Sequence, residues 1–446
     1  MQTLLAKFLE STGVSIDTRT LQPGQIFFAI KGDSFNGNLF ASGALDKGAL
    51  LAVVDDPSVC LDERYFLVND VLQSLQELAR EYRNTLEIPF IAITGTNGKT
   101  TTKELIASVL SQKFNILATE GNLNNHLGVP LTLLKIKPEH QLAIIEMGAS
   151  GKGEIELLCN IARPDIGLIT NVGAAHLEGF GSVEGVMEAK SELYRHLDGT
   201  GGKVLFPESL HEKKYFTSLS SPEWMAYTAE QMHGKSVLSV KLAESFPYIE
   251  LEIMIDTGEK IRVSTSLYGS YNFANLVNAI KIGDYFGLHP EMIAAGIGQY
   301  QPKNNRSQLV KDGFGNDIIM DAYNANPTSM AEALKHFKSV VHSGKKMLIL
   351  GDMLELGKDS LISHEQVLKQ LIAMEGIEAI CVGMEFGAAK KTLGMISQHI
   401  HFFEKTVQAK AYFDGLKVKD RLILVKGSRG IALERIFQDN LAVAKS

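Results

Sequence analysis

The sequence predicts an α/β protein of three domains, and three observations support this. Apolar runs of strand length alternate with stretches of helix length over most of the 446 residues, which is typical of parallel sheets covered by helices. A glycine-bearing loop follows the apolar run Phe90–Ile93. A chain of this length also divides into domains of about 100–200 residues. We expect an N-terminal domain over residues 1–87, a central domain over 88–302 and a C-terminal Rossmann-like domain over 303–446.

The N-terminal block is predicted to be a small mixed α/β domain. Its first residues lack the apolar core and cleavage site of a signal peptide and predict a short amphipathic helix. Helical spacing from Val71 to Tyr82 then leads to Pro89, at the expected boundary. Between these helices, alternating runs among Gly- and Asp-rich turns predict strands at Gln25–Ile30, Leu50–Val54 and Tyr65–Val68.

The central and C-terminal blocks each predict a mostly parallel sheet. A helix is expected over Thr101–Leu110, and the stretch Ser218–Leu267 is expected to be richer in strands. The C-terminal block has about the size of a dinucleotide-fold domain. The predicted strands are Phe90–Ile93, Leu142–Ile145, Ile166–Ile169 and Val204–Phe206, then Ile318–Met320, Met347–Leu350, Ala379–Val382 and Leu422–Val425.

Composition excludes several classes of protein. The net charge is −7 and no basic stripe is present, which argues against a nucleic-acid binder but not against a nucleotide binder. Cys60, Cys159 and Cys381 are odd in number and far apart, so we expect buried reduced thiols and no disulfide framework or zinc site. No stretch approaches the ~20 apolar residues of a membrane span. We therefore expect a cytoplasmic protein.

The strongest local signal is the segment TGTNGKTTT over residues 94–102, directly after Phe90–Ile93. Glycines let backbone N–H groups turn toward a phosphate, and the start of a helix adds a favourable partial charge. The loop is compressed to GxxGKT, because Ile93 stands where the common pattern has its first glycine. The residues expected to bind a nucleotide are Gly95, Thr96, Asn97, Gly98, Lys99, Thr100 and Thr101, with the Thr100 hydroxyl on Mg²⁺.

Two further side chains are expected at the same edge of the central sheet. Glu146 ends the second predicted strand and His176 follows the third, and the carboxyl ends of such strands meet beside a phosphate loop. Glu146 is a candidate Mg²⁺ ligand, with a capping or salt-bridging glutamate as the alternative. A lone histidine is more often structural, but its position favours a role for His176 here. For Lys190, on a predicted helix, the residues alone favour a solvated side chain.

Together these motifs resemble the Mur ligase family of ATP-dependent amide-bond-forming enzymes. The phosphate loop is joined by EMGAS at 146–150 and NVGAAHLEGFGS at 171–182. GNLNNHLGVP at 121–130, DAYNANP at 321–327 and GDMLELG at 351–357 are similar to signatures of the branch that adds D-Ala-D-Ala to a UDP-linked muramoyl tripeptide. DTR at 17–19 and GQIFFAIKG at 24–32 match the family's UDP-sugar domain. The resemblance covers nearly the whole chain and is weakest over Ser218–Leu267.

The resemblance implies ATP and two Mg²⁺ ions as cofactors. Thr100 and Glu146 would hold one ion. His176 would help to hold the second through a carbamate on Lys190, since carbamylation turns a cationic lysine into an anionic oxygen ligand. With Lys99 at the phosphates, the expected catalytic set is Lys99, Glu146, His176 and Lys190.

The resemblance also implies where the substrates bind. Asn275 would contact the adenine, and Arg306 and Asp321 would reach ATP from the C-terminal domain. The partners would be two small molecules, UDP-MurNAc-tripeptide and D-Ala-D-Ala, bound by a monomer. Contacts to them are expected from Asp17, Thr18, Arg19, Lys31, Asn122, Asn124, Asn125 and His126, with Asn324, Ala325 and Asn326 bordering the D-Ala-D-Ala pocket.

The implied reaction is carboxylate activation in peptidoglycan precursor synthesis. The terminal carboxylate of the tripeptide attacks the γ-phosphate of ATP to give an acyl phosphate and ADP, and the amine of D-Ala-D-Ala then displaces phosphate. Ligands on three domains imply closure about a hinge near Gln301–Asn305, which excludes water. The sequence does not identify the base for the amine, the third peptide residue (diaminopimelate or lysine), or the modification state of Lys190.

Two alternatives stay open at this point. One is another amide ligase with the same loop, either a different Mur ligase or an enzyme of the folylpolyglutamate synthase type. The other is a nucleotide-dependent switch without bond-forming activity, which would need only the phosphate loop. The expected convergence of Glu146, His176, Arg306 and Asp321 argues against the switch.

Overall fold

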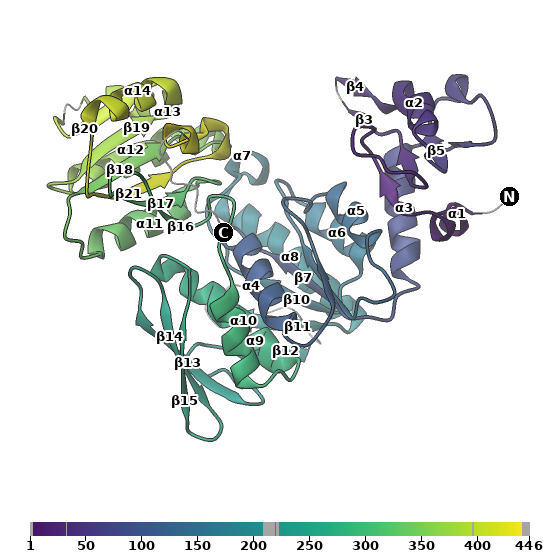
Figure 1. Ribbon diagram of the computed structural model, residues 1–446, viewed down its shortest axis with the longest axis horizontal. Helices are drawn as coiled ribbons and strands as arrows, with labels where there is room; N and C mark the ends of the chain where they lie inside the picture. Colours follow the sequence, from purple (N-terminus) through teal and green to yellow (C-terminus); the bar gives the residue numbers. More distant parts are fainter. Residues whose placement is uncertain (1–2, 33, 208–218, 220–222, 395–396, 439–446) are drawn as a thin grey trace.

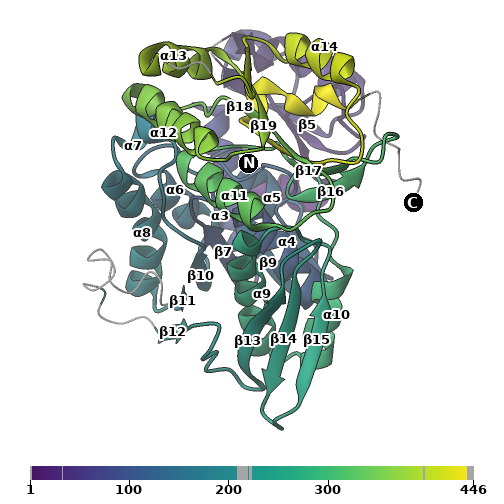
Figure 2. The same cartoon turned by 90° about the vertical axis from the view of Figure 1, so that its left-hand side faces the viewer.

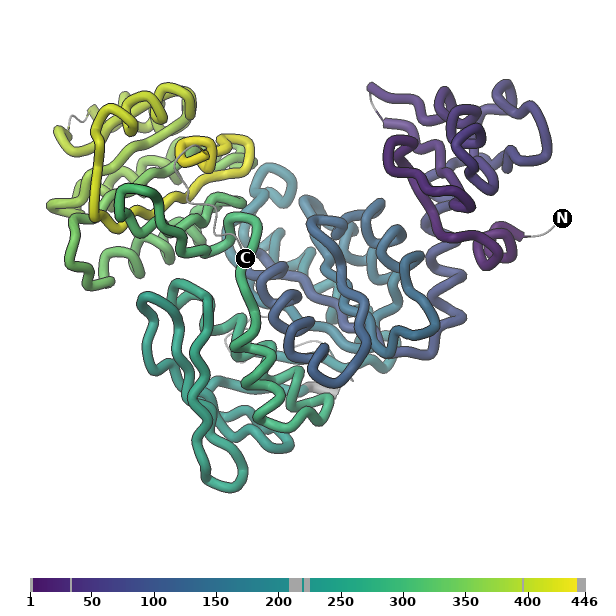
Figure 3. The backbone as a smooth tube through the Cα atoms, viewed as in Figure 1, coloured from purple at the N-terminus to yellow at the C-terminus, as the bar shows by residue number. Residues whose placement is uncertain are grey.

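The computed structural model describes residues 3–32, 34–207, 219, 223–394 and 397–438, and it has the three-block α/β architecture that the sequence predicts (Figure 1). The N-terminal block, purple in Figure 1, and the C-terminal block, green to yellow, lie on either side of the central block. The backbone trace in Figure 3 shows the same lobes, with an extension of the central block projecting away from both.

The N-terminal block is built on a four-stranded parallel sheet. It comprises β1 (Val14–Ser15), β2 (Ile26–Phe28), β5 (Leu51–Val54) and β6 (Tyr65–Leu67), a hairpin of β3 (Lys31–Gly32) and β4 (Phe35–Asn36), and the helices α1 (Leu4–Glu10), α2 (Ala41–Asp46) and α3 (Val71–Arg83). The strand order is β1-β2-β5-β6. Helix α3 begins where the Asp70 carboxylate accepts a hydrogen bond from the Gln73 N–H (2.8 Å), which satisfies a free donor of the first turn.

Helix α3 joins this block to the central one through a shared core. Its buried side chains Val71, Leu75 and Leu78 belong to one apolar cluster with Phe90 and Val129 of the central block. Burying each such side chain contributes about 1.5–3 kcal/mol. The two blocks are therefore held together by an apolar interface, beyond the connecting residues of the chain.

The central block contains a six-stranded, all-parallel sheet. It comprises β7 (Phe90–Thr94), β8 (Ile116–Ala118), β9 (Leu142–Glu146), β10 (Ile166–Ile169), β11 (Lys203–Pro207) and β12 (Glu223–Tyr227), with helices α4 (Lys99–Leu110), α5 (Gly128–Leu133), α6 (Glu154–Ala162), α7 (Leu177–Phe180) and α8 (Val183–Thr200). The order β12-β11-β10-β7-β9-β8 puts β7 between β10 and β9. Because side chains alternate along a strand, Phe90 and Ala92 enter one core and Ile91 and Ile93 the other.

A small antiparallel sheet extends the central block (Figure 2). It consists of β13 (Val237–Glu244), β14 (Glu250–Ile255) and β15 (Lys260–Ser264), followed by α9 (Phe273–Tyr285) and α10 (Pro290–Gln299). Leu251, Ile253 and Ile255 of β14 are buried in a core shared with α9 and α10. The strand-rich prediction for Ser218–Leu267 is confirmed for the described residues, while 208–218 and 220–222 lie outside them.

The C-terminal block carries a second six-stranded sheet. It comprises β16 (Gln308–Lys311), β17 (Asp317–Asp321), β18 (Lys346–Gly351), β19 (Glu378–Val382), β20 (Ile400–Phe403) and β21 (Leu422–Lys426), with helices α11 (Pro327–Ser339), α12 (Ser360–Ile372), α13 (Met384–Leu393) and α14 (Thr406–Leu416). The order is β16-β17-β21-β18-β19-β20, and all pairs are parallel except β16 with β17. This is the doubly wound type of sheet expected for the block.

Two predictions from composition can be compared with the fold. Within the described ranges, every helix is too short or too polar to cross a bilayer. All three cysteines are free thiols; Cys159 and Cys381 are buried, as expected, whereas Cys60 is half-buried. Burial raises the pKa of both the Cys159 and the Cys381 thiol, so these two side chains stay protonated.

Candidate active site

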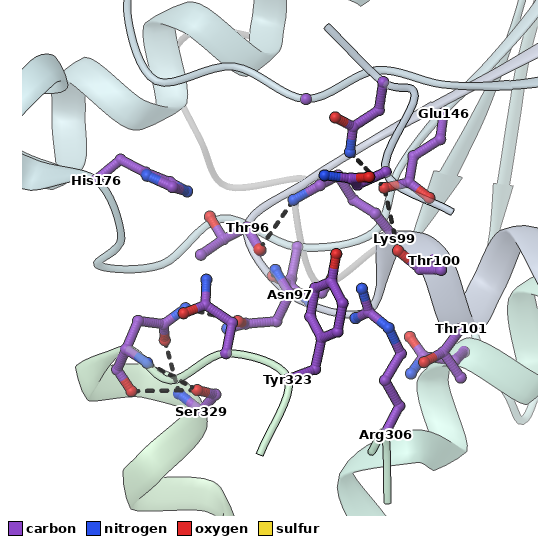
Figure 4. A pocket seen from close by; sticks show the side chains of 18 of the residues that line it. Thr96, Asn97, Lys99, Thr100, Thr101, Glu146, His176, Arg306, Tyr323 and Ser329 are labelled. Carbon is purple, nitrogen blue, oxygen red and sulfur yellow. Dashed lines mark hydrogen bonds between the residues drawn. The ribbon is translucent and has the colours of Figure 1, made fainter. Parts of the chain in front are cut away.

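A polar cavity of about 410 Å³ lies between the central and C-terminal blocks (Figure 4). The segments after β7, β9 and β10 meet there because β7 lies between the other two strands. Across the cavity lie the ends of β17 and β21. The predicted site residues on its wall are Thr96, Asn97, Gly98, Lys99, Thr100, Thr101, Asn122, Asn124, Asn125, Glu146, His176, Asn275, Arg306, Asp321, Asn324 and Asn326.

Two glycines of the phosphate loop are required by close contacts. Gly95 has a φ of 146°, and a Cβ atom there would lie 2.0 Å from the Thr170 Oγ1. Gly98 has a φ of 76°, and a Cβ atom would lie 2.4 Å from the Asn275 Oδ1. An L side chain would be strained at both positions. Helix α4 begins directly after the loop, at the cavity wall, so its first N–H groups can meet an anion.

The segment after β10 holds the phosphate loop in place. The Thr96 N–H donates to the Asn171 carbonyl (3.0 Å), and the Asn97 N–H donates to the Asn171 Oδ1 (2.9 Å). The Thr170 hydroxyl donates to the Asn97 carbonyl (2.6 Å), and the Gly173 N–H donates to the Thr96 hydroxyl (3.0 Å). These partners were not predicted, although they directly follow a predicted strand. The loop is therefore shaped before any ligand arrives.

Lys99 folds back over the loop that it follows. Its Nζ donates to the carbonyls of Gly95 (2.6 Å) and Thr96 (3.2 Å). Burial lowers the pKa of Lys99, the Glu146 carboxylate raises it, and the Arg306 guanidinium lowers it again. A phosphate group could replace the two carbonyls as partner and would favour the charged ammonium.

Glu146 ends β9 as a buried carboxylate with 1% exposure. Its Oε1 accepts hydrogen bonds from the Thr100 hydroxyl (3.1 Å) and the Asn124 Nδ2 (2.7 Å). Its Oε2 is buried without a hydrogen-bond partner in the described part of the chain, with the Lys103 Nζ 4.0 Å away. Such an orphaned oxygen costs at least about 1–3 kcal/mol. Glu146 and the Thr100 hydroxyl thus offer the hard oxygen ligands that Mg²⁺ shares with substrate phosphates, and they fit one such ion.

His176 and Lys190 lie beside this centre. The Nδ1 of His176 pairs with the Glu355 carboxylate of the C-terminal block. Burial lowers the pKa of His176, Glu355 opposes this shift, and Lys99 and Lys190 add to it. Lys190 has 2% exposure, so the solvated side chain favoured by the residues alone was wrong. Burial, reinforced by the charge of Lys99, lowers the pKa of Lys190 to about 7.

The low pKa bears on the expected second metal ion. A neutral amine is the form of lysine that adds CO₂, so Lys190 fits the carbamate implied by the resemblance. Among the described residues, no group of three or more His, Cys, Asp or Glu side chains could hold a metal ion. A carbamate on Lys190 would add an anionic oxygen ligand for a second ion beside His176.

The C-terminal wall of the cavity includes several charged residues. The Arg306 guanidinium stacks on the Tyr323 ring, 3.5 Å from its centroid. Asp321, at the end of β17, accepts hydrogen bonds from the Ser307 N–H (3.1 Å) and the Lys426 Nζ (2.7 Å). Both Asp321 oxygens thus have protein partners, and Asp321 braces the segment that carries Arg306. Lys426 and Tyr323 were missed as site residues, although each lies at or just after a strand end.

Some predicted site residues lie away from the cavity. No described residue of the N-terminal block lines it. In that block Asp17 pairs with Arg19 (2.6 Å), which holds the pKa of Asp17 at about 2, and Lys31 pairs with Asp55 (2.9 Å). The predicted residues that do not line the cavity are Asp17, Thr18, Arg19, Lys31, Gly95, His126, Lys190 and Ala325.

Comparison with known proteins agrees with the resemblance seen in the sequence. The models for the catalytic domain of the Mur ligase family, the Mur ligase middle domain and the Mur ligase glutamate ligase domain match residues 10–83, 93–283 and 305–429. A UDP-N-acetylmuramoyl-tripeptide--D-alanyl-D-alanine ligase of Bacillus subtilis is 36% identical over 96% of this chain and 92% of its own. The ligase of the same name from Escherichia coli is 32% identical over 95% and 92%.

Solved structures show the same relationship. A crystal structure of MurF from Acinetobacter baumannii has a TM-score of 0.82 at 29% identity and covers 96% of this chain and 92% of its own. MurF of Thermotoga maritima, solved in complex with ADP, has a TM-score of 0.81 at 24% identity, with 98% of both chains covered, and so shares the fold. The chain belongs to the MurF branch of the Mur ligase family.

Proposed function

We propose that this protein is an ATP-dependent ligase that joins D-Ala-D-Ala to the terminal carboxylate of UDP-MurNAc-tripeptide in peptidoglycan precursor synthesis. The ligases from B. subtilis and E. coli that bear this name support it. The main observation behind the proposal is that the edges of the central and C-terminal sheets face each other across one cavity. The phosphate loop and the orphaned oxygen of Glu146 lie on one side, and Asp321 and Asn324 lie on the other.

The first step brings two anions together. A carboxylate oxygen of the tripeptide attacks the γ-phosphorus, the bond to the β-phosphate oxygen breaks, and ADP leaves. Lys99, Arg306 and the start of α4 supply the positive potential that this approach requires. A preorganised donor of this kind raises kcat by a factor of about 10²–10³.

We propose Mg²⁺ as the cofactor, held by Thr100 and Glu146. When bound, the ion polarises phosphoryl oxygens and screens their charge. The Asn124 amide keeps the Glu146 carboxylate in place through its hydrogen bond to Oε1. A second ion would take His176 and a carbamylated Lys190.

The second step forms the amide bond. The neutral amine of D-Ala-D-Ala attacks the acyl carbon, the bond to the phosphate oxygen breaks, and the leaving phosphate takes the electron pair and the proton lost by the nitrogen. We place the dipeptide on the C-terminal wall beside Asn324, Ala325 and Asn326, of which the two asparagines line the cavity. Water must be kept out, because it would hydrolyse the acyl phosphate.

The remaining contacts divide between the blocks. We propose that Asn275 lies at the adenine; its side chain already bonds with Asn272 (2.8 Å) and Thr102 (3.0 Å), so it forms a rigid wall there. The UDP-muramoyl group would bind the N-terminal block, through Asp17, Thr18, Arg19 and Lys31, and reach the cavity past Asn122, Asn125 and His126. We accordingly propose domains at 1–87, 88–302 and 303–446, in a monomer located with its nucleotide substrates in the cytoplasm.

We also propose closure of the C-terminal domain about residues Gln301–Asn305. Asn304 and Asn305 have φ values of 58° and 57°, and Ser307 follows with 51°. Left-handed non-glycine residues are strained and occur where surrounding contacts hold them, which is typical of hinges and switch segments. Scattering profiles that stay identical with and without nucleotide plus substrate would argue against this motion.

The function is tested by phosphate release from ATP and Mg²⁺ in the presence of UDP-MurNAc-tripeptide. We expect release to require D-Ala-D-Ala, with a product mass equal to the pentapeptide. D-Glu, a diamino acid, and folate with glutamate serve as the control substrates. Release with one of these in place of D-Ala-D-Ala would assign another ligase activity, and substrate-independent ATP turnover would favour a nucleotide switch.

A further inference from the structure

The side chain of Asn97 in the phosphate loop is held from the opposite domain. Its backbone N–H and carbonyl are both bonded to the segment after β10. Its Oδ1 accepts a hydrogen bond from the Asn326 Nδ2 (2.7 Å), across 229 residues of sequence. Its Nδ2 is buried and has no partner within the described residues. The amide of Asn97 therefore has one fixed atom and one uncommitted donor in a residue that lines the cavity (Figure 4).

Asn326 cannot turn its own amide around, because it caps helix α11. Its Oδ1 accepts a hydrogen bond from the Ser329 N–H (2.9 Å), and its own N–H donates to the Ser329 hydroxyl (3.1 Å). This reciprocal capping arrangement satisfies donors at the start of the helix. Since Oδ1 is committed to the cap, Nδ2 is the atom that faces Asn97.

The orientations of the two amides are therefore fixed, with the cap residue as donor and the loop residue as acceptor. A donor from Asn326 requires an acceptor on Asn97, so the oxygen of Asn97 faces the helix and its nitrogen faces elsewhere. The pair exists only while the C-terminal domain is seated on the central one, because the two residues belong to different domains. Asn326 has 8% exposure, so water competes little for its amide.

We infer that Asn326 is a positioning residue that turns the Asn97 Nδ2 toward a phosphate oxygen of the bound nucleotide. The inference rests on the proposed function, since it takes the ligand of the loop to be ATP. It gives the seated C-terminal domain a direct effect on the phosphate loop, in addition to the residues it brings to the cavity. Both polar side-chain atoms of Asn326 are committed in this way, the nitrogen to Asn97 and the oxygen to the helix cap.

The test is a double-mutant cycle on binding of the ATP analogue AMP-PNP with Mg²⁺, measured by calorimetry on the full chain. Asn326→Ser keeps a capping hydroxyl but cannot reach Asn97, and we expect affinity to fall about 10-fold. Asn326→Asp keeps the cap and replaces the donor by an acceptor. The Asn97 amide then turns its oxygen toward the phosphates, and we expect a larger loss, about 100-fold.

The Asn97→Ala background separates positioning from a structural role. We expect Asn326→Ser to change affinity less than about twofold there, because the group through which it acts is gone. Equal losses in both backgrounds, or full affinity in Asn326→Asp, would overturn the inference. Thermal unfolding of each variant checks that the cap is retained. If the losses of AMP-PNP affinity are non-additive but the wild type does not ligate D-Ala-D-Ala, the proposed function fails and the inference stands. If the wild type ligates D-Ala-D-Ala but the losses of affinity are additive, the proposed function stands and the inference fails.

Discussion

The central and C-terminal sheets both border the cavity, but they place different kinds of polar group on its wall. The central sheet presents a glycine loop and the first turn of α4, shaped by bonds to the segment after β10, beside the Glu146 carboxylate. The C-terminal sheet presents side chains, among them Asp321 paired with Lys426, and Arg306 stacked on Tyr323. Each side is prepared before ligand binds, but by different bonds.

This difference decides how each side responds to change. Backbone donors are present for many sequences, provided that glycines permit the turn. Paired side chains are different, because removal of one partner leaves the other uncompensated. We therefore expect a substitution of Glu146 to act mainly on chemistry, and substitutions among the paired side chains of the C-terminal side to affect activity and stability together.

Glu146→Gln should have the largest effect on activity. The amide oxygen can still accept from Thr100 and Asn124, but the charge that would hold Mg²⁺ is lost. We expect ligation to fall about 10³-fold, with the melting temperature nearly unchanged. Phosphate release with all three substrates, over a range of Mg²⁺ concentrations, measures this. Activity within tenfold of the wild type would mean that Glu146 is not a metal ligand.

Asp321→Asn should lower both activity and stability, because it removes a paired charge on the C-terminal side. Lys426, with 3% exposure, would lose its charge partner, and the bracing of Ser307 beside Arg306 would weaken. We expect kcat/KM for ATP to fall about 10- to 100-fold, and the free energy of unfolding to fall by about 3 kcal/mol. Urea unfolding and steady-state kinetics measure the two effects. Adding Lys426→Met should restore much of the stability but not the activity; a loss of activity alone in Asp321→Asn would contradict this account.

The same contrast explains how far the sequence predicts the molecule. Strands buried on both faces appear as continuous apolar runs, so β7, β9, β10, β18, β19 and β21 were expected close to their observed bounds. Strands β8 (Ile116–Ala118) and β20 (Ile400–Phe403) were missed, because each is short and largely half-buried at a sheet edge. Parallel topology then places strand ends together, and for this reason Glu146 and His176 could be assigned to one edge.

Contacts between domains could not be predicted in this way. Asn97 and Asn326 are far apart in the sequence, and nothing local to either residue marks the pair. The burial of Lys190 depends on how α8 packs, and a lone lysine on a helix is usually exposed. Local patterns thus give the elements and the loop, whereas tertiary packing decides which side chains meet.

Lys190→Met tests whether the central side also depends on a buried charge. Burial lowers the pKa of Lys190 to about 7, from the ordinary value of 10.5 for a lysine in water. Between these values the unfolded chain binds a proton on Lys190 that the folded chain does not, so stability rises with pH across this window. Relative to Lys190→Met, we expect the wild type to gain about 2 kcal/mol in free energy of unfolding from pH 7 to pH 9.

The comparison for Lys190 requires buffer free of CO₂, so that no carbamate forms. Subtracting the free energy of unfolding of the variant removes the contribution of all other titrating groups, provided that their environments are unchanged. Parallel stability curves for the two proteins would mean that Lys190 is charged in the folded state at pH 7, and the carbamate assignment would then lose its support.

Glu355→Gln should have the smallest effect, because Glu355 contacts the central side at the exposed rim of the cavity. The Glu355 carboxylate joins the two sides through His176, and the Glu178 N–H reaches the Glu355 carbonyl (3.5 Å). The Glu355 side chain is 61% exposed, so water and salt screen the pair, and such pairs contribute about 0–1 kcal/mol. We expect a two- to fivefold loss of kcat/KM at low ionic strength and less at 0.5 M salt. A loss of about 100-fold would show that seating of the domains depends on this rim contact and not on the amide pair inside the cavity.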